Sequence, residues 1–370
     1  MNERRLAGLS ILLVGLVLHT GHGWADSWQH AVSTRLSTEF DTNPAMIPAY
    51  RDDGVWRFLF EPSYTLMGRV GASELKAGLA LQVVRSSNQT LSQDRENPSV
   101  FLDWRQRSDT GELGLTAKYD EVATRAAETD NVGVSFSDGR RASRTISASW
   151  SKALSERSTL SADGAYSDVS YTSGTFVDYV TRSGGMMFSY AWSERSTPFL
   201  RMSYSDTESA GNLPLTRFAN AILGWDWKFS DYLEGTLQAG GSKISGARIG
   251  TQAAAKVKYT GQKTQLALNA DRQISPSGLG GFVTADRVKG SWSYALSEHS
   301  NAGIDLEWRK SLSIATNNIN TASGVWLQRD LNSFWRMRMN YLHSTREGGT
   351  AGVASSNILG ITLIYSHTDF

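Results

Sequence analysis

The stretch LGWDWKFSDYLEGTLQAGGSK, residues 223–243, holds two runs in which apolar and polar residues alternate, separated by the short turn FSDY. Alternation with a period of two is the pattern of a β-strand that presents one apolar and one polar face. In the first run Leu223, Trp225 and Trp227 share the apolar face, whereas Asp226 and Lys228 share the polar face. The stretch therefore predicts an antiparallel hairpin with two chemically distinct sides.

The same hairpin unit recurs along nearly the whole chain. Six further examples are WRQRSDTGELGLTAKYD (104–120), ISASWSKALSERSTLSADGAYSD (146–168), FSYAWSERSTPFLRMSYSD (188–206), KVKYTGQKTQLALNADR (256–272), GSWSYALSEHSNAGIDLEWRK (290–310) and VWLQRDLNSFWRMRMNYLHS (325–344). Additional strands are expected near residues 30–40, 55–66, 73–85 and 357–365. The sum is about 18 strands, an even number as in bacterial single-chain barrels.

A sheet of this kind, repeated without helices and closed on itself, places its apolar face against lipid and its polar face toward a lumen. The predicted fold is all-β: a transmembrane antiparallel up-and-down β-barrel. The alternative is a soluble β-sandwich with the aromatic rings in its core. So many strands without crossover helices, behind a secretion signal, disfavour that alternative.

The N-terminal residues have the pattern of a secretion signal. Arg4 and Arg5 precede an apolar run over residues 6–18, and Gly23 and Ala25 are small residues at the two positions that a signal peptidase inspects. We predict a cleavable signal peptide over residues 1–25 and one barrel domain over residues 26–370. The alternative is an N-terminal membrane anchor, which the short apolar run disfavours.

Composition narrows the class of protein. Beyond residue 18 no apolar stretch reaches the length of a membrane helix, and the mean hydropathy is -0.33, which excludes a helical membrane protein. The chain has no cysteine, so disulfides and thiolate metal sites are excluded. A net charge of +1 shows no bias toward nucleic acid. Together with the barrel, these features predict the outer membrane of a Gram-negative bacterium.

The connections between strands predict the orientation. The short turns are expected at the periplasmic end, and longer Gly/Ser/Asn/Asp-rich loops such as SSNQTLSQDRENP and ATRAAETDNVGVSFSDGRR are expected at the cell exterior. Aromatic side chains near the short turns predict a girdle at the headgroup level of the periplasmic leaflet. Its expected members are Trp104, Trp150, Tyr190, Trp192, Trp225, Trp227, Trp292 and Tyr294.

The alternation also predicts which charges line the lumen, and it places the charges on that face alone. The expected lumen residues are Lys76, Asp103, Arg105, Lys118, Arg201, Asp226, Lys228, Lys256, Lys258, Arg287, Lys289, Asp305, Glu307, Arg309, Arg336 and Arg338. Basic residues dominate in the last third of the chain, and such a stripe can favour anions or acidic polysaccharide. The alternative is that these ions pair across neighbouring strands and stabilise the wall.

Signatures of an enzyme are scarce. After the signal peptide the histidines are His30, His299, His343 and His367, and none has the spacing of a metal site. We expect no metal, no cofactor and no catalytic residue; an outer-membrane hydrolase using His343 is the weakest alternative. Residues 41–44, DTNP, form a strong turn signal that we expect to reverse the chain after the first strand.

The chain resembles a known family in several of these features together. They are the signal peptide, the D-x-N-P-like loop, the repeated hairpins WSKALSERST, YAWSERST and WSYALSEHS, and a C-terminal Phe370. They are similar to the β-barrel porins associated with exopolysaccharide and exosortase (PEP-CTERM-type) gene clusters. The resemblance implies a passive porin or conduit for hydrophilic solutes, including surface polysaccharide, or alternatively a binding scaffold for polysaccharide assembly.

The predicted barrel and the family resemblance together indicate the expected partners. They are outer-membrane lipid, the barrel assembly machinery through Phe370, and polysaccharide or periplasmic export proteins. The apolar phase of the last strand is one residue out of step with Phe370, so we expect a bulge or a frayed end near residues 366–369.

Overall fold

The computed structural model describes residues 27–48, 54–132, 138–211, 214–246, 249–279, 282–312, 317–348 and 352–368. The predicted signal peptide and Phe370 lie outside the described residues, so cleavage after Ala25 and the assembly role of Phe370 stay predictions.

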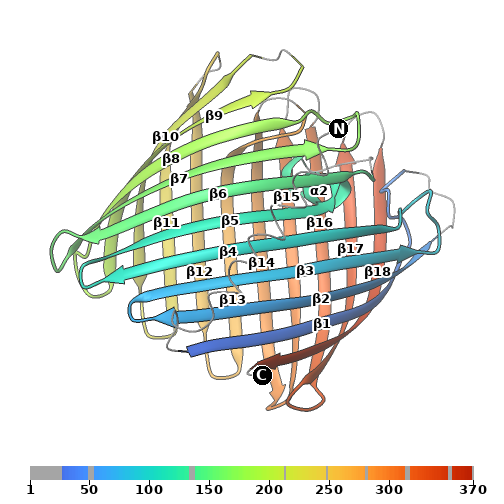
Figure 1. Cartoon of the computed structure of the whole chain (residues 1–370). Coiled ribbons are helices and arrows are strands. Elements are labelled where there is room, and N and C mark those ends of the chain that lie inside the picture. Colours follow the sequence, from blue (N-terminus) through green and yellow to red (C-terminus); the bar gives the residue numbers. More distant parts are fainter. Residues whose placement is uncertain are drawn as a thin grey trace.

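Eighteen antiparallel strands form one closed ring (Figure 1). Each strand pairs with its neighbours in sequence, and β1 closes the ring by pairing with both β2 and β18. The strands are β1 (Ser27–Asp41), β2 (Val55–Val70), β3 (Ser73–Ser86), β4 (Arg95–Ser108), β5 (Gly111–Ala123), β6 (Arg140–Ala153), β7 (Ser158–Tyr171), β8 (Tyr179–Tyr190), β9 (Ser196–Ser209), β10 (Thr216–Lys228), β11 (Leu233–Ile244), β12 (Ile249–Thr260), β13 (Thr264–Pro276), β14 (Phe282–Ser297), β15 (Ser300–Leu312), β16 (Asn317–Asp330), β17 (Trp335–Gly348) and β18 (Val353–Thr368). The predicted barrel is confirmed.

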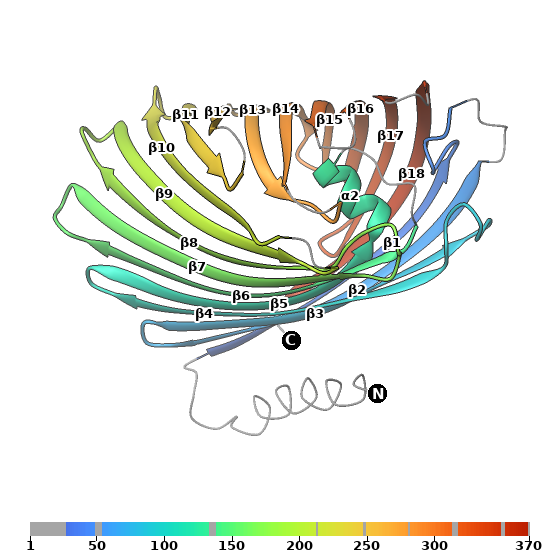
Figure 2. The same cartoon turned by 90° about the horizontal axis from the view of Figure 1, so that it is seen from above.

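One element of the described chain was not expected from the sequence: the helix α2 (Thr124–Val132), which follows β5. Figure 2 shows it inside the ring of strands. Among the described residues no helix is long and apolar enough to cross a membrane.

The two faces of the wall can be told apart through α2. Arg141 on β6 and Tyr171 on β7 both contact Glu128 of this helix, so their face of the wall points into the lumen. The alternate residues point outward and include Ile146 and Leu223, whose exposed fractions are 64% and 65%. Because such large apolar side chains cover the outside around the ring, the outer face is built to contact lipid. The protein is a transmembrane barrel of the outer-membrane type.

The aromatic residues predicted for the girdle lie near the short-turn end, which we call the periplasmic end. Trp192 lies in the turn between β8 and β9, and Trp104, Trp150, Tyr190, Trp225, Trp227, Trp292 and Tyr294 lie on the strands with their side chains outward. The rings of Trp225 and Trp227 stack with centroids 5.5 Å apart, and the Trp225 Nε1 donates to Ser196 Oγ at 2.7 Å. Their place at the lipid headgroups stays a prediction.

The expectation that charges occupy the inner face alone is wrong. At the end with the longer loops, the exterior end, ion pairs also lie on the outer face. Arg144 and Asp168 are 3.4 Å apart, and Arg182 and Asp206 are 3.3 Å apart. The physical reason is strand length: strands of 12 to 16 residues exceed the roughly 9–11 residues that cross the hydrocarbon. Beyond the lipid the outer face meets polar surroundings, where charges are stable.

Two details at the strand ends differ from the simplest expectation. Asp41, in the predicted turn, is buried and accepts hydrogen bonds from the Asn43 amide (3.0 Å), Ser356 Oγ (2.5 Å) and Arg57 Nη2 (3.0 Å). The turn therefore joins β1 to β2 and β18 as well as reversing the chain. The pairing of β18 with β1 continues without a register shift to Thr368, so the bulge or frayed end expected from residue 366 is absent up to that point.

Candidate functional site

The lumen of the barrel is the candidate site, and α2 lies within it (Figure 2). The helix contacts β5 and β6 on one side and β14 and β15 on the other. These two pairs lie half-way round the ring from each other. The helix therefore bridges opposite walls and constricts the lumen (Figure 2).

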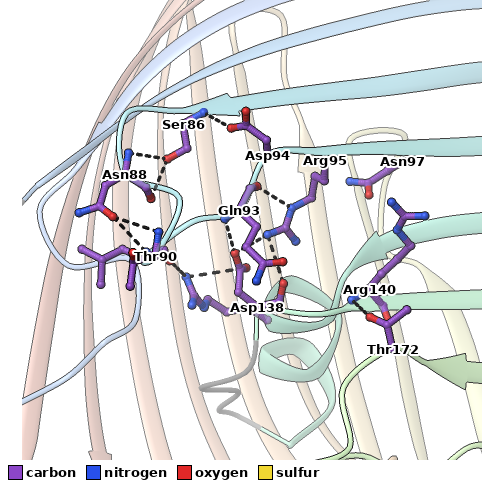
Figure 3. Close-up of polar contacts among 12 residues, drawn as sticks. Ser86, Asn88, Thr90, Gln93, Asp94, Arg95, Asn97, Asp138, Arg140 and Thr172 are labelled. Atoms are coloured by element: carbon purple, nitrogen blue, oxygen red, sulfur yellow. Dashed lines mark hydrogen bonds and ion pairs between the residues drawn. The ribbon is translucent and has the colours of Figure 1, made fainter.

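The loop that carries α2 is held at the exterior end by the loop between β3 and β4 (Figure 3). Asp138 forms an ion pair with Arg95 and accepts the Gln93 amide at 2.6 Å. Arg125, at the start of α2, donates to the Leu91 carbonyl at 2.9 Å. Burial lowers the pKa of Arg125, and the neighbouring Asp138 carboxylate opposes that shift.

A second contact holds the other part of the helix. Glu128 is completely buried, accepts the Tyr171 hydroxyl at 2.6 Å, and lies 3.7 Å from Arg141 Nε. Beside it, the Val177 amide donates to the Gly278 carbonyl at 2.8 Å, which joins the loop after β7 to the loop after β13. The exterior mouth is thus narrowed by three segments that bond to one another or to the wall.

The helix α2 was not predicted, although the sequence contains a signal for it. Thr124 begins the helix and is followed by Arg125, two alanines and Glu128, which are good helix formers. What the sequence could not give is the direction of the segment. Its position depends on contacts with residues 34 to 45 positions away in the chain.

The strand registers place all of the predicted lumen charges on the inner face. They are Lys76, Asp103, Arg105, Lys118, Arg201, Asp226, Lys228, Lys256, Lys258, Arg287, Lys289, Asp305, Glu307, Arg309, Arg336 and Arg338. Inward charges that the prediction left out include Arg141 on β6 and Arg346 on β17.

Many of these charges are paired along the wall. The Nζ of Lys258 lies 3.3 Å from Glu234, the Nε of Arg287 lies 3.2 Å from Asp271, and the Nε of Arg336 lies 2.6 Å from Asp330. Partly exposed pairs of this kind contribute little stability. They do leave the wall polar and wet, which suits the passage of hydrophilic solutes.

Lys256 differs from these residues because it forms no ion pair among the described residues. Its cross-strand neighbours are the uncharged Thr236 and Asn269. It lines two hollows on the inner wall, one of about 400 Å³ toward the periplasmic end and one of about 200 Å³ above it. The upper hollow also contains the amides of Gln238 and Gln252. A free ammonium group among amides offers donors for a carboxylate and for sugar hydroxyls.

The wall from β6 to β9 has a different chemistry. Its inward side chains are mostly hydroxyls that bond across strands, as in Thr145 with Ser167 at 3.2 Å and Thr181 with Thr207 at 3.0 Å. In the ring these strands lie opposite β15 to β18, which carry Arg309, Arg336 and Arg338. A solute in the lumen therefore meets hydroxyls on one side and guanidinium groups on the other.

An inward aromatic residue was also missed. The ring of Trp326 lies over Gly303, which leaves room for it because glycine has no side chain. The Trp326 Nε1 donates to Asp305 at 3.1 Å, and the Arg338 guanidinium lies 4.5 Å from the ring centroid. The sequence signal is the position of Trp326 in the polar phase of its strand, between the outward residues Val325 and Leu327.

No metal-binding arrangement appears in the described part of the chain. No group of three or more His, Asp or Glu side chains is placed to hold a metal ion there. His343 points outward and its Nδ1 lies 2.9 Å from Asn357 Oδ1. This position on the outer wall is unlike an enclosed hydrolase site.

No family model and no curated protein matches the sequence. Solved structures do match in shape. Pseudomonas aeruginosa OccK2 (OpdF) in complex with glucuronate has a TM-score of 0.56 at 11% identity, covering 93% of this chain and 100% of that one. OpdK with vanillate, from the same species, has a TM-score of 0.55 at 10% identity, covering 94% and 100%. Acinetobacter baumannii OccAB4 has a TM-score of 0.52 at 12% identity, covering 93% and 99%.

The chain has the fold of these outer-membrane porins. At such low identities the likeness concerns the fold alone, and it extends over essentially the whole length of both chains. An association with exopolysaccharide gene clusters finds no counterpart among them.

Proposed function

We propose that the protein is a passive outer-membrane channel for small hydrophilic solutes, with a preference for anions and in particular for sugar acids. The observation that carries the proposal is Lys256, a lumen cation without an ion pair among the described residues, which lines two hollows of the inner wall. Of the carboxylates that also line these hollows, Glu234 and Asp271 are already paired with Lys258 and Arg287. The basic inner wall from β12 to β17 supports the same preference, since it lowers the energy of an anion in the lumen.

The neighbours support the solute class by analogy. OccK2 is described in complex with glucuronate and OpdK with vanillate, and both of these molecules are carboxylates. Glucuronate also carries hydroxyls, which the Ser/Thr wall of β6 to β9 is able to bind in this chain.

The constriction by α2 favours small solutes over a polymer. A second candidate function, export of an acidic polysaccharide, is favoured by the continuous hydroxyl wall, because an extended sugar chain can bond to many hydroxyls in turn. It requires α2 to leave the lumen during transport. A binding scaffold for polysaccharide remains the alternative in which no solute passes.

The proposal is tested with the mature protein refolded into liposomes and planar bilayers. We expect discrete conductance steps, and faster swelling of liposomes in glucuronate than in glucose at equal osmolarity. A barrel without conductance would refute the channel. Equal rates for the two sugars would refute the preference for acids and leave an unselective channel. Passage of long acidic oligosaccharides at the rate of glucuronate would favour the export function.

A further inference from the structure

The outer face of the barrel carries a second organised set of charges, away from the lumen. On β8, β9 and β10 the residues Arg182, Asp206 and Arg217 lie side by side in one row of the sheet. Glu208 lies 3.6 Å from Arg182, and Lys243 on β11 is one row below, beside Ala219. We call Arg182, Asp206, Glu208, Arg217 and Lys243 the outer cationic cluster.

The cluster lies immediately above the lipid-facing surface. On the outer face, Tyr204 is the next residue of β9 after Asp206 in the direction of the periplasmic end. Met202 and Leu223 lie further in that direction, with exposed fractions of 54% and 65%. Because these apolar side chains require hydrocarbon, the cluster lies at the height of the lipid headgroups of the outer leaflet. Its cations cannot reach solutes in the lumen, which is on the other side of the wall.

The periplasmic end has no comparable cluster. Among the described strand residues near that end, the charges that point outward are Lys152 on β6 and Arg329 on β16, far apart in the ring. The other basic residues of that end, such as Arg157, Arg195 and Lys263, lie in the turns beyond the strands. The barrel therefore presents chemically different surfaces to the two leaflets.

The cations of the cluster have unused bonding capacity. Arg182 forms ion pairs with Asp206 and Glu208, yet 52% of its side chain is exposed. Arg217 and Lys243 are exposed and form no ion pair among the described residues. The cluster has three cations, on β8, β10 and β11, and two carboxylates, both on β9. Guanidinium groups bind phosphate in bidentate fashion, and clustered basic residues beside a membrane recognise anionic headgroups.

We infer that the outer cationic cluster binds the phosphorylated sugar headgroup of the glycolipid of the outer leaflet, lipopolysaccharide. Phosphates at the sugar headgroup reach Arg217 and Lys243 while the acyl chains pack on Met202 and Leu223. Asp206 and Glu208 hold Arg182 in place beside this site. The site does not depend on what passes through the lumen.

The test uses the mature barrel in detergent and counts bound lipid A by native mass spectrometry. The variant R217Q/K243Q removes one Arg and one Lys without breaking an ion pair of the described residues, so folding is preserved. The matched control K152Q/R329Q removes the same two residue types from the periplasmic end of the same face. Heat-modifiable migration in gels verifies that each variant is folded.

We expect R217Q/K243Q to weaken binding of lipid A roughly tenfold or more, and K152Q/R329Q to leave it within about twofold of the wild type. Lipid A without phosphates is expected to bind the wild type as weakly as phosphorylated lipid A binds R217Q/K243Q. Equal weakening by both variants would overturn the inference, because it would show a general charge effect. Unchanged binding in R217Q/K243Q, or equally tight binding of dephosphorylated lipid A, would also overturn it.

Discussion

Tyr171, the last residue of β7, donates a hydrogen bond of 2.6 Å to the carboxylate of Glu128 in α2. The helix thereby joins the wall on its own side of the lumen while it also reaches β14 and β15 on the other. Because Glu128 is completely buried, this contact is shielded from solvent, and its loss costs more than the loss of an exposed one.

Loosening this contact is expected to widen the channel. Tyr171→Phe removes the donor and leaves a buried carboxylate with one bond fewer, a cost of about 1–3 kcal/mol in the anchoring of α2. We expect a larger mean single-channel conductance and more current noise in planar bilayers. Tyr166→Phe, on the lipid side of the same strand, is the control and should leave conductance unchanged. Identical currents in both variants would show that α2 does not set the conductance.

The same helix marks the limit of what the sequence predicts. Strand number and phase follow from local alternation, because each residue such as Trp225 or Asp226 must face lipid or lumen throughout. The inward direction of α2 is not determined by a local sequence pattern. It depends on contacts between distant segments, such as Arg125 with Leu91 and Gln93 with Asp138. The lumen side of the wall was predictable for the same local reason, whereas the filling of the lumen was not.

The outer charges show a second limit. The alternation rule for barrels assumes lipid along the full strand, and it therefore failed at Arg144 and Arg182, where the strands continue above the hydrocarbon. Trp326 is a third case, because a ring can face the lumen when a glycine on the next strand leaves room for it.

Anion preference is expected to depend on Lys256 more than on the other lumen lysines. Lys256→Gln removes a cation whose cross-strand neighbours are uncharged, whereas Lys289 has Glu307 beside it. We expect the reversal potential in a KCl gradient to move toward cation selectivity in Lys256→Gln, and to move less in Lys289→Gln. Lys152→Gln, on the outer face, should not move it. Equal shifts for all three variants would contradict a local role of Lys256.

The two faces of one strand should respond oppositely to a new charge. Ala148 points outward between Ile146 and Trp150, and Ser147 beside it points inward. Ala148→Arg is expected to lower the free energy of unfolding in lipid vesicles by about 2–4 kcal/mol, the usual cost of arginine near the middle of a bilayer. Ser147→Arg should cost much less, because the lumen is wet. Denaturant titration monitored by tryptophan fluorescence measures both, and a larger loss in Ser147→Arg would reverse the assigned faces.

Close packing of an inward ring on a glycine gives the last prediction. Phe199 on β9 covers Gly224 on β10, and a Cβ at position 224 would lie 2.1 Å from the ring. Gly224→Ala therefore forces the ring to move and is expected to destabilise the barrel by about 1–3 kcal/mol. Gly184→Ala is the matched control, because a Cβ there would meet its nearest atom at an ordinary 3.5 Å.

The double variant Phe199→Leu/Gly224→Ala separates steric conflict from the intrinsic effect of alanine. Leucine lacks the ring atoms that the new methyl group would meet, so the double variant should be more stable than the sum of the two single losses implies. Additive losses, measured by urea titration of the refolded barrel, would show that the ring has room to move and that the glycine is not required beneath it.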